Sequence, residues 1–345
     1  MTANHSLRLP RLGLGTAPLG NLFTAVPDDV AAHTLERARE GGIRHVDTAP
    51  HYGLGLAERR LGAALVGCDR DRLVVSTKVG RRLVPSPATA HLVDDGGFAV
   101  PADQRRAWDV TPEGLAAGLA ESLDRLGLDH VDVAYLHDPD EHVAPGSTVE
   151  HVLDEALPGL LALRDARLAR AIGVGSKSTA ALVHAASSGA VDALMVAGRF
   201  TLLEQPALAD VMPAAARADV AVVAVGVYNS GALAVERPSA DQPYEYGTMP
   251  AEVLGRLRRL ADVCARFGVT LPEAAVQFPF LHPAVASVVV GVRRPEEVVA
   301  LLDRWAAPVP AELWSALAEE GLVDEGLVAL GLVALGSVDR RGVAW

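Results

Sequence analysis

Four polar residues of the sequence stand at or just after the ends of short apolar runs. Asp47 and Lys78 each end such a run, Tyr52 follows Asp47 by five residues, and His137 ends a third run. An acid, a phenol, an amine and an imidazole are the groups that enzymes use to move protons. If the fold brings these four side chains together, we expect a proton-transfer site.

The four residue types suit one kind of reaction in particular. Moving a hydride to or from a carbonyl carbon requires a proton to move at the oxygen. A tyrosine, with an unperturbed pKa of about 10, does this well only if an ammonium stabilises its phenolate. Tyr52, Lys78 and Asp47 fit the roles of proton carrier, ammonium and holder of the ammonium, and His137 fits that of a group orienting the substrate. This chemistry needs no metal.

The elements that would position these residues alternate along the chain. Strand-like runs are separated by helix-like patterns, which is typical of βα units and a parallel sheet. We therefore expect an α/β fold, a (β/α)8 TIM barrel of eight parallel strands, whose carboxyl ends meet on the face that carries the chemistry. The eight candidate strands are Leu12–Gly15, Ile43–Asp47, Leu73–Lys78, Val131–His137, Ala169–Val174, Ala193–Ala197, Val220–Gly226 and Ala286–Val290.

Two segments interrupt this alternation. Residues 80–109 form a long insertion directly after the third strand, and long loops in compact domains are usually lids or binding loops. We expect one barrel domain over residues 1–320, with this insertion beside its active site. The remaining tail, 321–345, repeats Gly-Leu-Val. It packs on the barrel, joins a subunit contact or is poorly ordered, and the pattern favours none of the three.

Composition excludes several classes of protein. The chain has 345 residues, 50% of them hydrophobic, and a net charge of −12, which disfavours nucleic-acid binding. Cys68 and Cys264 are its only cysteines, so no disulfide framework is expected, and Cys264 falls on the apolar stripe of a helical pattern over 251–267. With no signal peptide and no membrane span in the pattern, we expect a cytoplasmic protein with a small-molecule substrate. No particular oligomeric state is favoured.

The four residues lie within motifs that resemble those of the aldo-keto reductase superfamily, and the resemblance covers nearly the whole chain. It implies that Asp47, Tyr52, Lys78 and His137 form a catalytic tetrad in a nicotinamide-dependent enzyme. The matching motifs are Gly13-Leu14-Gly15-Thr16, Asp47-Thr48-Ala49 with Tyr52-Gly53, Ser76-Thr77-Lys78, Leu136-His137, Ile172-Gly173-Val174-Gly175-Ser176 and Gly291-Val292-Arg293-Arg294-Pro295.

Finer features resemble the sugar-dehydrogenase branch of that superfamily. They lie in residues 16–23, 49–55, 137–142, 198–203 and 228–231. The branch contains L-fucose dehydrogenases, D-threo-aldose 1-dehydrogenases and the similar pyridoxal 4-dehydrogenases. The resemblance implies oxidation of a cyclic hemiacetal (a lactol) to a lactone. Pyridoxal oxidation and general aldehyde or ketone reduction are the alternatives within the class.

The resemblance also supplies a set of cofactor-binding candidates. Ser176 would hold the carboxamide, although Lys177 stands where relatives carry Asn, and residues 229–231 would face the pyrophosphate. Arg293 and Arg294 suit a 2′-phosphate, but the nearby Glu297 would repel one and tolerate a ribose hydroxyl. Between NAD and NADP we therefore favour NAD. The complete set is Gly15, Thr16, Asp47, Ser176, Tyr228, Asn229, Ser230, Gly231, Gly291, Arg293, Arg294 and Glu297.

Candidates for substrate contact lie in the loops beside the tetrad. Trp108 offers a flat face for a sugar, or alternatively anchors the insertion on the barrel. The neighbouring Arg105 and Arg106 are expected to be a solvated pair. The complete set of substrate candidates is Asn21, Phe23, His51, Tyr52, Trp108 and His137.

Two other functional classes make different predictions for the sequence. A cofactor-binding regulatory subunit, as in potassium-channel β subunits, would keep the tetrad but lack the substrate-side motifs. A metal-dependent hydrolase would place His and carboxylate ligands at several strand ends, whereas only His137 ends a strand here. Asp138-Pro139-Asp140 is interpreted as a turn rather than as a metal site, so we expect no metal.

Overall fold

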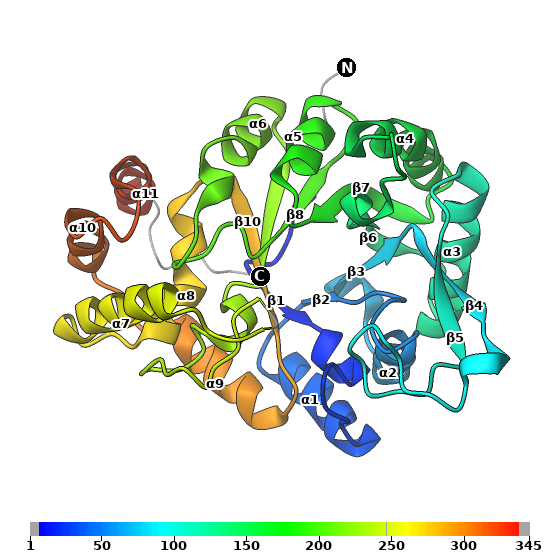
Figure 1. Cartoon of the computed structure of the whole chain (residues 1–345), viewed down its shortest axis with the longest axis horizontal. Coiled ribbons are helices and arrows are strands. Elements are labelled where there is room, and N and C mark those ends of the chain that lie inside the picture. Colours follow the sequence, from blue (N-terminus) through cyan, green and yellow to red (C-terminus); the bar gives the residue numbers. More distant parts are fainter. Residues whose placement is uncertain (1–6, 246, 338–345) are drawn as a thin grey trace.

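Eight parallel strands close into a barrel in the computed structural model, which describes residues 7–245 and 247–337 (Figure 1). Around the barrel the order is β1-β10-β9-β8-β7-β6-β3-β2. The prediction of a (β/α)8 barrel is therefore confirmed. The barrel strands are β1 (Leu12–Gly15), β2 (His45–Asp47), β3 (Val74–Val79), β6 (Val131–His137), β7 (Ala169–Ser176), β8 (Ala193–Ala197), β9 (Ala221–Val225) and β10 (Val285–Gly291).

Helices surround the barrel, as Figure 1 shows. The α-helices are α1 (Asp28–Glu40), α2 (Leu56–Leu65), α3 (Pro112–Leu126), α4 (Val149–Asp165), α5 (Thr179–Ser187), α6 (Val211–Ala218), α7 (Ala251–Arg266), α8 (Leu271–Gln277), α9 (Pro295–Ala306), α10 (Ala311–Glu319) and α11 (Glu325–Ser337). Short 3-10 helices are η1 (Ala17–Gly20), η2 (Arg70–Arg72), η3 (Pro87–Thr89), η4 (Pro139–His142), η5 (Pro206–Leu208), η6 (Asn229–Gly231) and η7 (Phe278–Leu281).

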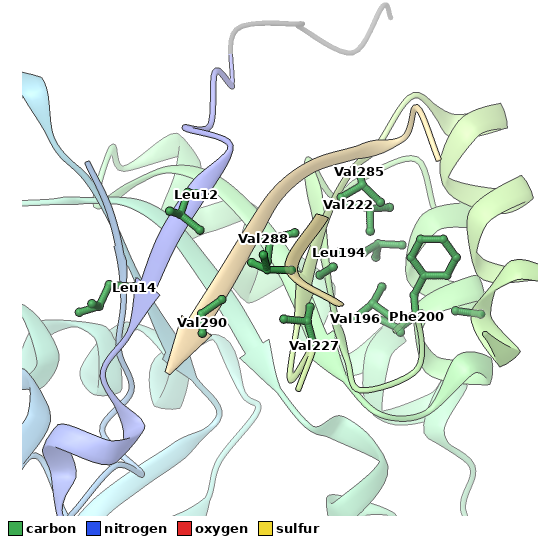
Figure 2. Packing of buried hydrophobic residues seen from close by; sticks show 14 of the residues in the cluster. Leu12, Leu14, Leu194, Val196, Phe200, Val222, Val227, Val285, Val288 and Val290 are labelled. Atoms are coloured by element: carbon green, nitrogen blue, oxygen red, sulfur yellow. The ribbon is translucent and has the colours of Figure 1, made fainter. Parts of the chain in front are cut away.

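Alternation along the strands divides the apolar side chains between two layers. Leu12 and Leu14 of β1, with Val288 and Val290 of β10, belong to the large cluster between the barrel and its helices (Figure 2). The intervening positions face the barrel interior, as expected for a strand period of two. One of them is Gly13, where a Cβ would come within 3.0 Å of the His45 ring, so glycine makes room for this imidazole.

The barrel interior is filled by a second, smaller cluster. Tyr135, Met195, Val223 and Val289 belong to it, and Leu7 and Leu9, which precede β1, pack against it. Because these two leucines enter from the amino-terminal ends of the strands, they close that end of the barrel. The opposite end, where the strands finish, is left for polar side chains.

The insertion after β3 contains a sheet that the sequence did not reveal. β4 (Arg81–Pro85) and β5 (Gln104–Trp108) pair antiparallel, with Arg81 opposite Trp108. Each strand has only five residues and carries two adjacent arginines, so neither shows the polar–apolar alternation that marks a strand in a sequence. Leu83 packs with Phe98 and Val100 of the connecting loop in a small core of its own. The insertion is thus a built structure rather than an open loop.

The tail packs on the barrel as far as the structure describes it. α10 and α11 lie outside the ring of helices, with α10 beside α7 and α11 beside α10 and η7 (Figure 1). Leu327 and Val328 of α11 are buried, and a Cβ at Gly331 would collide with Leu281 of η7. The Arg256 guanidinium donates to the Leu322 carbonyl at 2.5 Å. Residues 338–345 lie outside the described part. No helix of the described residues is both long and apolar enough to cross a bilayer.

A capping threonine fixes the return of the chain from the insertion. Thr111 Oγ1 accepts the Gly114 N–H at 3.1 Å at the start of α3. Removing such a cap costs about 1 kcal/mol. We expect Thr111→Ala to lower Tm by about 2 °C in a thermal melt. Thr111→Ser, which keeps the hydroxyl, should melt like the parent protein. An unchanged Tm in the alanine variant would show that this cap contributes nothing.

Candidate active site

The four proton-transfer candidates meet at the carboxyl ends of β2, β3 and β6. Lys78 Nζ donates to Asp47 Oδ2 at 2.6 Å and to the Thr48 carbonyl at 2.9 Å, and both charged residues are buried. The same nitrogen lies 4.6 Å from the centre of the Tyr52 ring. The ring of His137 lies 6.1 Å from that of Tyr52, edge to face. The strand ends thus bring together the residues that the sequence singled out.

A tight turn after β2 carries Tyr52 back over the barrel. The Tyr52 N–H donates to the Ala49 carbonyl at 3.1 Å. Gly53 follows with φ of 63°, and a Cβ there would collide with the Gly20 carbonyl of η1. Glycine is required at this position for both reasons, because it tolerates positive φ and lets two backbones meet. The Tyr-Gly pair of the motif therefore sets where the phenol lies.

A buried polar chain supports Asp47 from inside the barrel. Ser76 Oγ donates to Asp47 Oδ1 at 2.8 Å, so each carboxylate oxygen has its own donor. His45 lies behind, 3.4 Å from Ser76 Oγ and 3.1 Å from Ser287 Oγ. Burial lowers the pKa of His45 to about 4, which leaves it neutral. None of these three residues was among the predicted site residues, although His45 and Ser76 stand two before Asp47 and Lys78 and therefore share their interior face.

Burial and the ion pair set the protonation states of the tetrad. Burial raises the pKa of Tyr52, and the Lys78 ammonium opposes that rise. For Lys78, burial alone would lower the pKa, but Asp47 and Tyr52 raise it above its usual value. At neutral pH Lys78 is therefore cationic and Tyr52 carries its proton. Lys78 acts on Tyr52 in the expected direction, but burial has the larger effect.

His137 is a neutral imidazole, and one of its ring nitrogens makes no hydrogen bond to the described residues. Burial, with Arg81 and Lys78 adding to it, lowers the pKa of His137 well below its usual value. Nε2 lies 3.4 Å from Asp138 Oδ2, which in turn accepts from Arg81 at 2.7 Å. Nδ1 is buried and has no hydrogen-bond partner among the described residues. That nitrogen is therefore a buried polar atom whose hydrogen bond is unmade. Arg81 and Asp138 are contacts of His137 that were not among the predicted site residues.

The substrate candidates divide into two groups. His51 stands in the site, with its ring 5.5 Å from His137 and 5.3 Å from Phe98. Trp108 stacks on His142 of η4 at 4.9 Å, and the Arg81 guanidinium lies over it at 4.5 Å. These contacts agree with the anchoring role for Trp108.

The other two candidates lie in the loop after β1. The Asn21 amide donates to the Ala99 carbonyl and accepts from the Val26 N–H and from Arg60, so it ties three segments together. The side chain of Phe23 is 59% exposed. Asn21 therefore stabilises the loop after β1, whereas Phe23 offers an apolar surface.

The cofactor candidates on β1, β7 and β10 surround the same barrel end. Gly15 pairs with Gly291, and both lie where β1 and β10 end. Thr16 Oγ1 is buried and donates to the Asp47 carbonyl at 3.0 Å. Ser176 donates to Asp140 of η4, so its hydroxyl proton is already committed. The backbone of Gly291 is thus exposed to a ligand, whereas Gly15 is buried and the two hydroxyls are engaged within the chain.

The remaining cofactor candidates lie in η6 and at the start of α9. Asn229 donates to Glu204 at 3.0 Å, while its Oδ1 is buried and unpartnered among the described residues. Arg293 donates from its guanidinium to the Leu22 carbonyl, and its N–H donates to Glu297 at 2.7 Å. Of the other members, Arg294 is the exposed N-cap of α9, Ser230 and Gly231 have positive φ, and Tyr228 donates weakly to the Pro272 carbonyl.

Comparison with known proteins identifies this arrangement. Residues 11–320 match the model of the aldo/keto reductase family. The chain belongs to this family. It is 48% identical to a D-threo-aldose 1-dehydrogenase of Pseudomonas sp over 93% of this chain and 97% of that one. It is 33% identical to a pyridoxal 4-dehydrogenase of Microbacterium luteolum over 92% and 95% of the two chains.

Solved structures agree on the fold. An aldo-keto reductase from Bacillus halodurans in its holo form superposes with a TM-score of 0.70 at 23% identity, covering 90% of this chain and 91% of that one. A glycerol dehydrogenase from Gluconobacter oxydans superposes with a TM-score of 0.69 at 22% identity, covering 90% of this chain and 91% of that one. This aldo/keto reductase is accordingly an oxidoreductase that uses a nicotinamide cofactor and a small-molecule substrate.

The residues at the barrel end fit such a cofactor. Three buried polar atoms there lack partners among the described residues, namely His137 Nδ1, Asn229 Oδ1 and Arg293 Nε. Unpaired buried polar atoms are costly, and a polar ligand removes that cost. His137 ends β6, and Asn229 and Arg293 follow β9 and β10, so all three lie at the end of the barrel where the paired Gly15 and Gly291 also lie.

Proposed function

We propose that this oxidoreductase is an aldose 1-dehydrogenase that oxidises a cyclic sugar hemiacetal to its lactone, and that Asp47, Tyr52, Lys78 and His137 are its catalytic residues. The observation that carries the proposal is the buried Lys78–Asp47 pair, at 2.6 Å, directly beside the ring of Tyr52. The 48% identity to a D-threo-aldose 1-dehydrogenase over nearly the full length of both chains supports the substrate class.

Each residue has a defined task in this reaction. Bound nicotinamide supplies the acceptor for the hydride that leaves the anomeric carbon. Tyr52, as tyrosinate, takes the proton of the anomeric hydroxyl, so that the carbon–oxygen double bond of the lactone forms. Lys78 stabilises the tyrosinate, and Asp47 holds the ammonium in place. The neutral His137 orients the substrate oxygen, because its buried imidazole lies beside the phenol.

The test is the absorbance of reduced cofactor formed with each oxidised nicotinamide. The panel contains L-fucose, L-galactose, D-arabinose and pyridoxal. Turnover of an aldose supports the proposal. Turnover of pyridoxal alone would retain the mechanism and replace the substrate. Pyridoxal oxidation is the second candidate function because a pyridoxal 4-dehydrogenase is 33% identical to this chain. No turnover on the panel would leave an aldehyde or ketone reductase, to be tested in the reductive direction.

For the cofactor we propose NAD. The Glu297 carboxylate accepts the Arg293 N–H at 2.7 Å in the first turn of α9, close in sequence to the two arginines that would hold a 2′-phosphate. A carboxylate repels a phosphate and accepts a hydrogen bond from a ribose hydroxyl.

Changing this carboxylate should change the cofactor preference. Glu297→Gln removes the charge and keeps the shape, so we expect the ratio of kcat/KM for NAD over NADP to fall about 10-fold, mainly through KM for NADP. The neighbouring Glu296→Gln, also exposed in that turn, serves as the control. An equal ratio in the two variants would remove Glu297 from the preference.

A further inference from the structure

An arginine of the insertion reaches into the active site and contacts the residue next to Tyr52. Arg106 of β5 donates from Nε to His51 Nδ1 at 2.5 Å and from Nη2 to the His51 carbonyl at 3.0 Å. The sequence pattern predicts that Arg105 and Arg106 are a solvated pair. That expectation holds for Arg105, which is exposed, and is wrong for Arg106, whose side chain is only 14% exposed. The alternation of the strand separates the two neighbours.

The contact determines where the proton of His51 lies. Arginine only donates hydrogen bonds and stays charged in proteins. His51 Nδ1 must therefore accept, which means that it carries no proton and that Nε2 carries the proton of the neutral ring. A cationic His51 would need a proton on Nδ1 and would lose this bond. Burial, followed by Arg106, Arg81 and Lys78, accordingly lowers the pKa of His51 to about 3.

A buried carboxylate holds the arginine in this position. Asp94 accepts from Arg106 Nη1 at 2.5 Å and from Nη2 at 2.8 Å, a bidentate pair. The Asp94 side chain is 3% exposed, and its N–H donates to the Val100 carbonyl at 2.9 Å. A Cβ at position 96 would lie 2.7 Å from the guanidinium carbon, so Gly96 leaves the room that Arg106 occupies. A bidentate, buried pair of this kind is rigid.

The protonated nitrogen of His51 belongs to a ring that stands among the reacting groups. The ring centre lies 6.1 Å from that of Tyr52 and 5.5 Å from that of His137, and Phe98 packs edge-on at 5.3 Å. Within residues 7–245 and 247–337, no group accepts a hydrogen bond from Nε2. His51 is therefore a neutral donor of fixed tautomer, close to the oxygen that Tyr52 and His137 would hold.

We propose that Asp94 and Arg106 fix His51 as a hydrogen-bond donor to the sugar hydroxyl on the carbon next to the reacting one. His51 then contacts the substrate, and Arg106 and Asp94 are positioning residues that act through it. This inference rests on the proposed aldose dehydrogenase function and makes the insertion its specificity element. A donor placed for a hydroxyl discriminates against substrates that lack it, because its hydrogen bond is then left unmade.

The proposal is tested with L-fucose and its 2-deoxy analogue. His51→Leu should lower kcat/KM for L-fucose about 10-fold and leave the analogue within about 2-fold, since one neutral hydrogen bond is lost. His51→Gln, which keeps a donor, should recover part of the loss. Arg106→Met should resemble His51→Leu, and the double variant should be no worse than His51→Leu alone. Arg105→Met is the matched control and should behave like the parent protein.

A readout without substrate separates this proposal from the proposed function. In ¹⁵N NMR of the parent protein, His51 should show an unprotonated Nδ1 and a protonated Nε2, and Arg106→Met should mix the two tautomers while Arg105→Met does not. A protonated Nδ1 in the parent, or equal losses for L-fucose and its analogue, would overturn the proposal. If His51 shows the expected tautomer, with the proton on Nε2, but the protein turns over no sugar, the proposed function is overturned instead. The substrate contact assigned to His51 is then overturned with it.

Discussion

Tyr52→Phe is expected to lower kcat about 10²- to 10⁴-fold in either direction, the usual contribution of a positioned acid or base. The variant keeps the ring, which packs near Phe98 and Lys78, and removes only the hydroxyl. Affinity for the cofactor should change by less than about 2-fold, because a neutral hydroxyl beside a retained ammonium contributes little to ground-state binding. Stopped-flow or steady-state absorbance measures kcat, and quenching of protein fluorescence measures cofactor binding.

Tyr135→Phe is the matched control for this prediction. Tyr135 lies opposite Lys78 in the pairing of β3 with β6, but its hydroxyl is buried in the barrel interior with no partner among the described residues. Removing an unpaired buried hydroxyl is neutral or stabilising. We expect this variant to keep its activity. Equal activity in Tyr52→Phe and Tyr135→Phe would exclude Tyr52 as the proton carrier.

The protonation state of Tyr52 also predicts how the rates of oxidation and reduction depend on pH. Because burial raises the pKa of Tyr52, the phenol is protonated at neutral pH. Oxidation requires tyrosinate, so its rate should rise as the pH rises toward that pKa. Reduction requires the protonated form, so its rate should fall through the same region. His137 stays neutral over this range, because its pKa lies well below the usual value, and it contributes no opposing limb above neutrality.

The barrel and the tetrad could be predicted from the sequence for a physical reason. Strand ends such as Asp47 and His137 are marked by a polar residue that follows an apolar run, and parallel strands share one catalytic face. β1, β6 and β8 begin and end at the predicted residues, and β2 starts two residues later than expected, at His45. Periodicity places a residue on a strand and a face, which is all that the tetrad requires.

The contacts made by the insertion could not be predicted from the sequence in the same way. Arg106 and Asp94 are twelve residues apart in a segment without a clear period, and their meeting depends on the pairing of β4 with β5. The same limit applies to Trp108, whose stacking on His142 joins two separate loops. Electrostatics adds a second limit, because whether burial or Lys78 dominates the pKa of Tyr52 is decided by three-dimensional packing.

Lys78→Met is expected to lower the oxidative kcat about 10²- to 10⁴-fold, a loss similar to that of Tyr52→Phe, because the two residues act as one unit. Lys78 opposes the rise in the pKa of Tyr52 that burial causes, so its removal should raise that pKa further. The oxidative pH profile should therefore move to higher pH, whereas Tyr52→Phe should abolish the profile. The measurement is kcat against pH with the best substrate of the panel.

Stability provides the control for Lys78→Met. Losing the ammonium leaves Asp47 buried with Ser76 as its remaining side-chain donor, and an unpaired buried charge costs about 3–5 kcal/mol. The double variant Asp47→Asn/Lys78→Met removes that charge and should recover much of the Tm while staying inactive. The Lys78 pKa lies above its unfolded value, so the pair stabilises the parent protein below that value and loses this contribution as the pH rises through the folded pKa. Activity recovered along with Tm in the double variant would mean that Lys78 supports the fold and takes no part in the proton transfer.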